Sequence, residues 1–259
     1  MNNITLTEDE KDLSNELVKF SLQFCTACYF GSPSDKEVKV NNGTVTLIEY
    51  KNVKYGITNF HVIEAFRQRL EEEPELELYI GNALINLEGL VRDEDEKLDL
   101  CILNLDDYDE EEFRSNGNIP TTFYPIQELS KINVSKGDFI LFGGYPGVWR
   151  ERPEVNHLIF DSLSTGSMEV SEVTERNIRC EFSLEGCHIT LSEHHNSIPN
   201  NFGGLSGGPV FLNRTLPSGI NIFEFVGIIY EYMELSNSIM IRPSSFIDEN
   251  MTLKKINFQ

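Results

Sequence analysis

The chain has 259 residues, of which 40% are hydrophobic and 24% are charged, and its formal net charge is -21 at pH 7. This hydrophobic fraction is enough for a sizeable core, and all-β barrel proteins of this length often form one compact unit. The negative charge is concentrated in residues 1–130, which hold 27 acidic and 11 basic residues. Such a chain repels nucleic-acid phosphates, so we expect no nucleic-acid partner.

The sequence also argues against a membrane or secreted protein. It has no run of about 18 apolar residues, so we expect no transmembrane helix and no membrane partner. The first twenty residues are acidic, unlike the basic and then apolar pattern of a secretory leader. The cysteines are odd in number and form no dense framework, as is typical of a reducing compartment. We therefore expect a cytoplasmic protein.

The cysteines are interpreted as buried free thiols and not as metal ligands. Cys25 and Cys28 form a C-x-x-C pair, and Cys180, Cys187 and His188 are conceivable further ligands. Structural zinc normally needs two closely spaced ligand clusters, and the second cluster here is poor. Free cysteines are usually buried as small apolar residues. The acidic runs at residues 71–73, 93–96 and 109–112 lack EF-hand spacing and are interpreted as solvated loops. We expect no metal and no cofactor.

In chain order, the first predicted element is a helix within residues 1–24. Thr7-Glu-Asp-Glu10 resembles a capping box. The apolar residues that follow at helical spacing are Leu13, Leu17, Phe20 and Phe24. We expect this stripe to pack on the barrel that follows, and docking of a partner or regulatory element is the alternative.

Strands dominate residues 25–115. Residues 44–50 and 53–58 are β-branched runs joined by Lys51-Asn52, a hairpin turn. A short helical piece follows at 62–70, and further strands are predicted at 76–80, 84–90 and 98–105. This region is predicted to be the first β-barrel.

Residues 116–133 are predicted to connect two halves, because this stretch contains Asn116-Gly117 and Pro120 after an acidic run. Residues 134–259 then form the second half. Its predicted strands are residues 140–142, 157–160, 166–173, 177–183, 188–192, 210–212, 223–232 and 239–242. A short terminal helix is expected from Pro243.

The stretch most suggestive of chemistry is Asn201-Phe-Gly-Gly-Leu-Ser206-Gly-Gly-Pro-Val210. Four glycines around one serine indicate a backbone that needs positive φ or a close approach. If Ser206 is a nucleophile, its own N–H and that of Gly204 can point at one spot and form an oxyanion hole.

A nucleophilic serine needs a base, and the base needs an orienting group. The β-rich run Tyr55-Gly-Ile-Thr-Asn-Phe-His61 ends at a histidine, and Lys97-Leu-Asp99-Leu-Cys-Ile-Leu103 has an aspartate at the mouth of an apolar strand. The order His, Asp, Ser is one of three found on unrelated folds with this chemistry.

Four motifs together resemble the trypsin-like serine peptidases of the chymotrypsin class, and more closely their bacterial, HtrA-like type without disulfides. The motifs are Thr58-Asn-Phe-His61-Val, Leu98-Asp99-Leu-Cys-Ile-Leu103, Gly143-Gly-Tyr-Pro-Gly147 and Gly203-Gly-Leu-Ser206-Gly-Gly-Pro209. The resemblance covers residues 25–247. It implies an all-β fold of two six-stranded antiparallel barrels, here flanked by an N-terminal helix and a short C-terminal helix.

The resemblance implies that His61 takes the Ser206 proton, that Asp99 fixes the His61 tautomer, and that an acyl-enzyme forms on Ser206 before hydrolysis. Rival bases are His157, His188, His194 and His195, which lack an aspartate at a nearby strand mouth. Rivals of Asp99 are Asp93, Asp95 and Asp106, which are expected in charged loops.

Two positions depart from the digestive members of that family. Leu205 replaces an aspartate that pairs with a newly cut N-terminus, so activation by N-terminal insertion is not expected. Tyr230 falls near a small hydroxyl residue that usually supports the catalytic aspartate. The resemblance also implies a substrate pocket with Asn200 at its base and with Tyr230, Glu231 and Tyr232 along one wall. Asn200 is not an acid, so we expect cleavage after an uncharged residue.

A bare protease in a reducing cytosol needs restraint, so we expect a conditional effector, such as a stress or phage-defence protease switched on by a sensor protein. The alternative is a protease-fold module that binds peptides without cutting them. A non-proteolytic acyl hydrolase is a weaker alternative, because Gly204-Leu-Ser206-Gly-Gly208 matches G-x-S-x-G but the chain order of the three residues is reversed.

Overall fold

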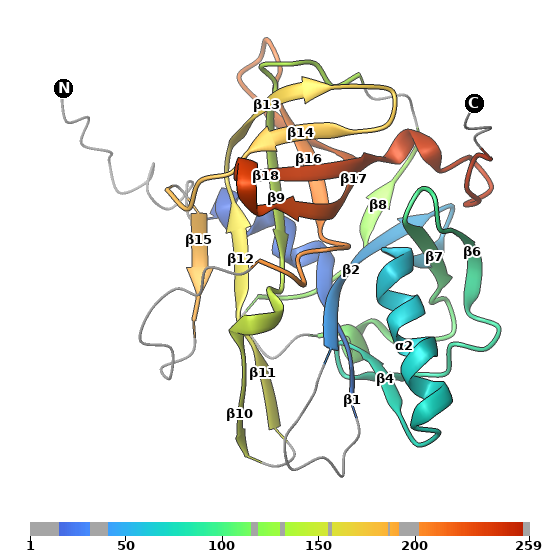
Figure 1. Cartoon of the computed structure of the whole chain (residues 1–259). Coiled ribbons are helices and arrows are strands. Elements are labelled where there is room, and N and C mark those ends of the chain that lie inside the picture. Colours follow the sequence, from blue (N-terminus) through green and yellow to red (C-terminus); the bar gives the residue numbers. More distant parts are fainter. Residues whose placement is uncertain are drawn as a thin grey trace.

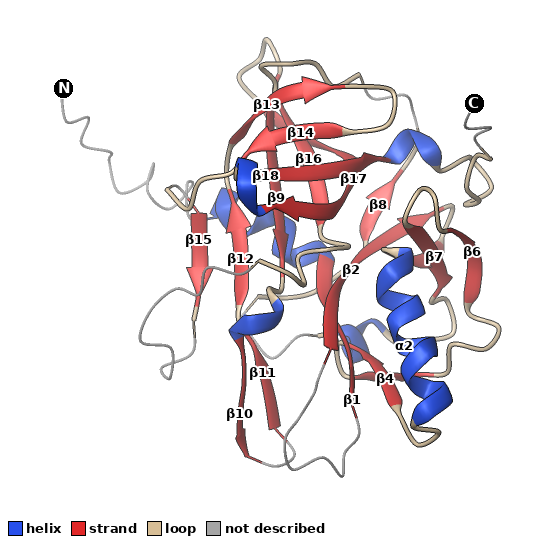
Figure 2. Ribbon diagram, viewed as in Figure 1, coloured by secondary structure: helices blue, strands red, loops and turns tan. Residues whose placement is uncertain are grey.

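The computed structural model describes residues 16–31, 41–114, 119–129, 133–154, 157–185, 187–191 and 202–255. The molecule consists of two mainly antiparallel β units with α2 (Phe60–Glu72) on the outside of the first (Figures 1 and 2). The predicted capping box at Thr7-Glu-Asp-Glu10 and the predicted pocket residue Asn200 lie outside the described residues.

The first sheet has the strand order β5-β4-β1-β2-β3-β7-β6, with β8 paired to β2. The strands are β1 (Cys25–Gly31), β2 (Asn41–Tyr50), β3 (Val53–Thr58), β4 (Glu77–Ile80), β5 (Ala83–Ile85), β6 (Val91–Asp95), β7 (Leu100–Asn104) and β8 (Tyr124–Ile126). No pairing of the described residues joins β5 to β6, so this unit is an open half-barrel. β2 and β3 are joined by the predicted two-residue hairpin turn at Lys51-Asn52.

The second sheet contains a closed six-stranded barrel, β13-β14-β18-β17-β16-β9, because β13 pairs back to β9. Its strands are β9 (Phe139–Gly144), β13 (Met168–Val173), β14 (Ile178–Glu181), β16 (Pro209–Thr215), β17 (Asn221–Met233) and β18 (Ser238–Pro243). β12 (Ser162–Thr165) and β15 (Cys187–Thr190) extend the sheet from β9, while β10 (Arg150–Glu154) and β11 (His157–Phe160) form a separate hairpin. The chymotrypsin-like two-barrel architecture is thereby confirmed, with one barrel closed.

Short helical turns fill the connections. They are η1 (Phe20–Phe24), η2 (Glu110–Phe113), η3 (Gly147–Trp149), η4 (Glu234–Ser236) and η5 (Ser244–Phe246). The predicted N-terminal helix therefore ends as a 3-10 turn in which Phe20 and Phe24 pack against Phe211 of the second barrel. The terminal helix expected from Pro243 is likewise a 3-10 turn.

One local prediction was wrong, and two short elements were not predicted. The acidic run at 93–96 is not a loop, because Asp93 to Asp95 belong to β6 and pair with β7. The run at 109–112 begins a 3-10 turn that Asp109 and Glu112 close as a capping box. The connection at 116–133 contains β8, whose parallel pairing with β2 was not predicted. No residue of β6 is fully buried and residues 109–112 are all exposed, so neither acidic stretch shows the apolar pattern by which strands and helices are recognised.

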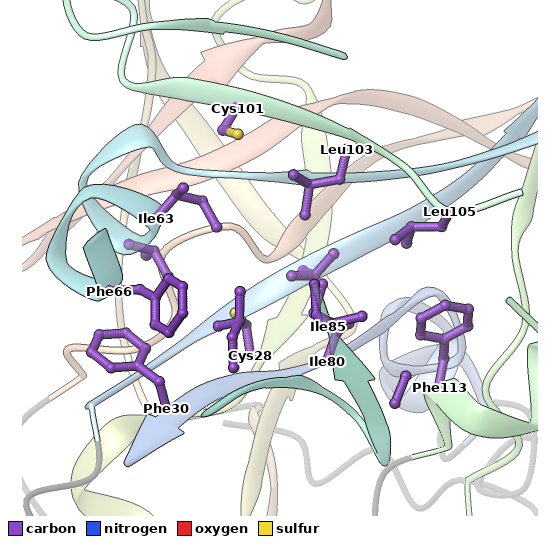
Figure 3. Packing of buried hydrophobic residues seen from close by; sticks show 14 of the residues in the cluster. Cys28, Phe30, Ile63, Phe66, Ile80, Ile85, Cys101, Leu103, Leu105 and Phe113 are labelled. Atoms are coloured by element: carbon purple, nitrogen blue, oxygen red, sulfur yellow. The ribbon is translucent and has the colours of Figure 1, made fainter. Parts of the chain in front are cut away.

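The core of the first unit lies between its sheet and α2. Ile63 and Phe66 project from the helix onto Cys28, Phe30 and the strands beyond, as Figure 3 shows. Because α2 follows β3 directly, this packing fixes the first helical turn at the junction of the two barrels. The residues of that turn include His61.

Candidate active site

His61 and Asp99 meet where β3 and β7 run side by side. β3 pairs with β7 as far as Thr58 opposite Cys101, so the residues just beyond these strand ends are neighbours. The backbone N–H of His61 donates to Asp99 Oδ1 at 2.9 Å, and His61 Nδ1 lies 2.8 Å from Asp99 Oδ2. An ionised carboxylate only accepts hydrogen bonds, so Nδ1 is the donor in this contact and Nε2 is the ring nitrogen that Asp99 leaves open.

The carboxylate of Asp99 is held from several sides. Asp99 has a φ of 53°, in the left-handed region that aspartate and asparagine tolerate better than most residues. The Asn59 amide donates to the Asp99 carbonyl at 2.8 Å and to Oδ2 at 3.2 Å. The side chain of Asp99 is 20% exposed and that of His61 is 52% exposed. The carboxylate is therefore fixed, while the imidazole is open to a ligand.

Ser206 lies next to this pair. A methyl group added to Gly43 would contact both Val62, which follows His61, and the carbonyl oxygen of Ser206. An added methyl on Gly207 would overlap the Thr44 carbonyl oxygen and lie 2.7 Å from Thr58 Oγ1. The loop of Ser206 is thus seated against the end of β3 and the start of α2.

The glycine-rich loop turns tightly before Ser206. The Leu205 N–H donates to the Phe202 carbonyl at 3.2 Å, which closes a four-residue turn. Gly204 occupies its third position with a φ of 99°, as a type II turn requires. This conformation explains a glycine at that position, because a side chain would also meet Gly147 N at 2.5 Å.

Two backbone N–H groups of the loop take no part in these bonds. Gly147 N–H donates to the Gly203 carbonyl at 2.5 Å. Because a trans peptide holds C=O and N–H antiparallel, the Gly204 N–H points away from Gly147. Neither the Gly204 N–H nor the Ser206 N–H donates to any of the described residues. The predicted pair of oxyanion donors is therefore unengaged.

Sequence analysis missed the residues that fasten this loop to the first barrel. The Thr44 N–H donates to the Ser206 carbonyl at 2.8 Å, and Thr44 Oγ1 donates to the Gly204 carbonyl at 2.8 Å. Thr46 Oγ1 donates to the Gly207 carbonyl at 2.6 Å. Both threonines are fully buried on β2. A polar residue at every second position usually indicates a solvent-facing strand side, so the pattern gave no signal of a site.

The hydroxyl of Ser206 is not bonded to His61. Ser206 Oγ donates to the Tyr230 carbonyl at 3.4 Å, and no hydrogen bond among the described residues joins Ser206 to His61. Such contacts are often long in ligand-free sites and tighten when substrate binds. The fold thus brings Ser206, His61 and Asp99 into one region, but the hydrogen bond between Ser206 and His61 is not formed.

The three residues predicted to form one wall of a substrate pocket lie at the end of β17. Tyr230 is half-buried with its ring over Arg242, and Glu231 is exposed. The ring of Tyr232 packs edge-on against Phe182 and Phe202, with centroids 5.7 Å and 5.0 Å apart. Tyr232 therefore belongs to a group of aromatic side chains with Phe182 and Phe202.

The rival residues have other partners. Asp93 accepts from the backbone of Leu253, Asp95 from that of Leu98, and Asp106 from that of Lys54. His188 lies on β15, where burial and then the charge of Lys19 lower its pKa. His194 and His195 lie outside the described residues, and the side chain of His157 is not described.

All five cysteines are free thiols. Burial raises the pKa of Cys28 and of Cys180 to about 12, so neither is poised as a thiolate. The described residues contain no group of three or more His, Cys, Asp or Glu side chains arranged to hold a metal ion. No helix in the described ranges is long and apolar enough to cross a membrane.

Comparison with known proteins yields likeness of fold only. No family model matches the chain, and no curated protein matches it. Among solved structures, the Rv3671c protease from M. tuberculosis in its active form is 14% identical, with 94% of this chain and 88% of that one covered and a TM-score of 0.41. An atomic-resolution structure of HBP is 11% identical, with 85% and 86% covered and a TM-score of 0.42.

Proposed function

We propose that this protein is a serine endopeptidase in which Ser206 is the nucleophile, His61 the general base and Asp99 the group that orients His61. The observation that carries the proposal is the His61–Asp99 pair at 2.8 Å, set beside a serine whose loop presents two unengaged N–H groups. Nucleophile, base, orienting carboxylate and oxyanion donors are the parts that acyl transfer needs.

In the proposed reaction, Ser206 Oγ attacks the carbonyl carbon of a peptide bond and its proton passes to His61 Nε2. The N–H groups of Gly204 and Ser206 stabilise the charge that develops on the carbonyl oxygen. His61 then protonates the leaving amine, and water attacks the acyl-enzyme by the same route in reverse. Asp99 remains ionised and stabilises the imidazolium.

An extended peptide is the ligand that suits the neighbouring strand edge. β17 pairs with β16 only as far as Ile228 opposite Pro209, and Ile229 then bonds to Gly207 and Gly208. Residues 231–233 have no strand neighbour on that side within the described chain. An exposed strand edge can take up a peptide as an added strand. We propose a protein substrate bound in this way and, from Asn200 in the predicted pocket, cleavage after an uncharged residue.

Labelling with a fluorophosphonate probe tests the proposal without a known substrate. Wild-type protein is expected to label at one serine, and Ser206→Ala, His61→Ala and Asp99→Asn are expected to lose labelling. His188→Ala is the matched control, because His188 lies on β15 at the end of the second sheet and contacts Thr190. This variant should label as wild type does. Labelling that persists in Ser206→Ala would refute the assignment of the nucleophile.

The second candidate is a peptide-binding module without hydrolysis. It is favoured by one observation, the Ser206 hydroxyl that donates to the Tyr230 carbonyl instead of contacting His61. A restrained enzyme that awaits an activating protein would have the same resting geometry, and we propose such conditional activity, in stress or phage defence, as its biological setting. A module would bind extended peptides yet stay unlabelled with every activator tested, whereas a restrained enzyme would label once activated.

A further inference from the structure

A groove opens in the first barrel between α2 and the chain that joins β5 to β6. Its volume is about 520 Å³, and its lining includes the apolar residues Phe66, Leu70, Leu76, Ile85, Leu87 and Val91. It lies where the first sheet is open, because no pairing of the described residues joins β5 to β6. Both the size and the apolar lining are typical of sites that bind a ligand.

The lining of the groove runs from the core to the surface. Phe66 is 5% exposed, and its ring packs edge-on against Phe30 with centroids 5.5 Å apart (Figure 3). Leu76 and Ile85 belong to the same buried cluster. Leu70, in the last turn of α2, is 36% exposed. A contiguous exposed apolar surface rimmed by polar residues is typical of an interaction site.

The positive charges that α2 brings to the groove are already paired. Arg67 Nη2 lies 2.8 Å from Glu94 Oε2 on β6. Arg69 Nη2 lies 2.9 Å from Glu73 Oε1. Because carboxylates of the same chain neutralise both guanidinium groups, this border of the groove does not attract an acidic ligand.

Several negative charges beside the groove have no such partner. The chain between the lining residues Leu70 and Leu76 is Glu-Glu-Glu-Pro-Glu. Four carboxylates of this chain and of the lining are exposed and form no ion pair with a described residue: Glu71, Glu72, Glu75 and Glu88. Residues 64–94 together hold nine acidic and three basic residues. The border of the groove is therefore acidic and attracts a positively charged partner.

We propose that this groove binds an amphipathic segment of another protein, with aliphatic side chains that enter the groove and lysine or arginine side chains that meet its acidic border. An amphipathic helix laid into an apolar groove is a common form of such binding. A second copy of this chain is a poor occupant, because its net charge of -21 repels the acidic border. His61 lies in the first turn of α2, so a bound segment would contact the helix that carries the proposed base.

The test measures peptide binding by the full chain as Ser206→Ala protein, so that the proposed activity cannot cut the peptide and the result does not depend on that activity. The probe is a helix-forming peptide of leucine and lysine. One control peptide has serine in place of leucine, and the other has glutamate in place of lysine. The leucine–lysine peptide is expected to bind one per chain and roughly tenfold more tightly than the serine peptide, the effect of burying one leucine side chain. The glutamate peptide is expected not to bind.

A leucine variant locates the binding. Leu70→Ser is expected to weaken binding of the leucine–lysine peptide roughly tenfold, for the same reason. Leu84→Ser is the matched control and should bind as before, because Leu84 is a 54% exposed leucine of β5 whose side chain points to the opposite face from Ile85. Leu87→Ser replaces Leu70→Ser should the latter not fold.

Acidic variants test the border of the groove. Glu71→Gln combined with Glu75→Gln is expected to weaken binding of the leucine–lysine peptide roughly twofold to fivefold, as the loss of exposed charge pairs does. The control is Glu172→Gln combined with Glu175→Gln, which removes two exposed acids from the second barrel and should leave binding unchanged.

Three results would overturn the inference. Equal binding of the leucine and serine peptides would mean that net charge alone attracts them. Equal binding by folded Leu70→Ser and its parent would place the peptide elsewhere, as would an equal loss in Leu84→Ser. A dimer of the protein that Leu70→Ser dissociates would show that a second copy covers the groove.

Discussion

Replacement of Gly207 by alanine is expected to destabilise the whole protein, because this residue joins the two barrels. Gly207 has a φ of 92°, and an added Cβ would overlap the Thr44 carbonyl oxygen. That oxygen accepts from Thr58 Oγ1 at 2.8 Å and belongs to β2, whose N–H groups and hydroxyls hold the Ser206 loop. The methyl group therefore has no room unless the loop moves away from β2.

The magnitude has two parts. A left-handed conformation costs a non-glycine residue about 1–2 kcal/mol, and the forced overlap adds about 1–3 kcal/mol. The free energy of unfolding should fall by about 2–5 kcal/mol, a large fraction of the total. For a chain of this size each kcal/mol lowers Tm by about 2–4 °C, so Gly207→Ala is expected to unfold roughly 5–20 °C below wild type.

The matched control is Gly219→Ala. Gly219 has a similar φ of 82° but nothing within 4 Å of an added Cβ, so it carries the conformational cost alone. Thermal unfolding followed by circular dichroism compares the two variants with wild type. Equal Tm values for Gly207→Ala and Gly219→Ala would show that the loop is not seated against β2 as described. The labelling of Ser206 should also be lost in Gly207→Ala and kept in Gly219→Ala.

Three further predictions concern single positions. Asp99→Asn should fold like wild type, because asparagine tolerates a φ of 53°, yet lower the labelling rate roughly 10⁴-fold; full labelling would remove Asp99 from the mechanism. Asn52→Gly should raise the free energy of unfolding by up to about 1 kcal/mol, because Asn52 has a φ of 61° in a two-residue hairpin turn and glycine adopts positive φ without steric cost; an unchanged or lower Tm would contradict this expectation. The Tyr79 hydroxyl donates to Glu77 at 2.7 Å, and this bond raises the pKa of Tyr79 to about 12. Its stabilising effect should be present below about pH 10 and be lost as pH rises toward 12, and ultraviolet titration of Glu77→Gln should show one tyrosine ionising at lower pH than in wild type.

Much of the fold was predictable because its signals are local. The hairpin at Lys51-Asn52 was read from two β-branched runs around a turn, and both turn residues have the positive φ that such turns need. His61 after β3 and Asp99 before β7 were read as strand ends, and the pairing of these strands brings them together. The acidic strand β6 was missed because it lies at the end of its sheet, has no fully buried residue and therefore lacks the alternating apolar pattern of a half-buried strand.

The sequence by itself determined the chemical groups of the candidate site and their order, because nucleophile, base, carboxylate and turn glycines are each specified by residue type. Only the tertiary structure decided which residues hold these groups in place. Thr44 and Thr46 become inter-barrel donors only because β2 faces the Ser206 loop, and Arg242 meets the Tyr230 ring only because β18 pairs with β17. Such contacts join residues that are far apart in the chain. They produce no repeating pattern of apolar and polar residues in either segment, so the sequence does not reveal them.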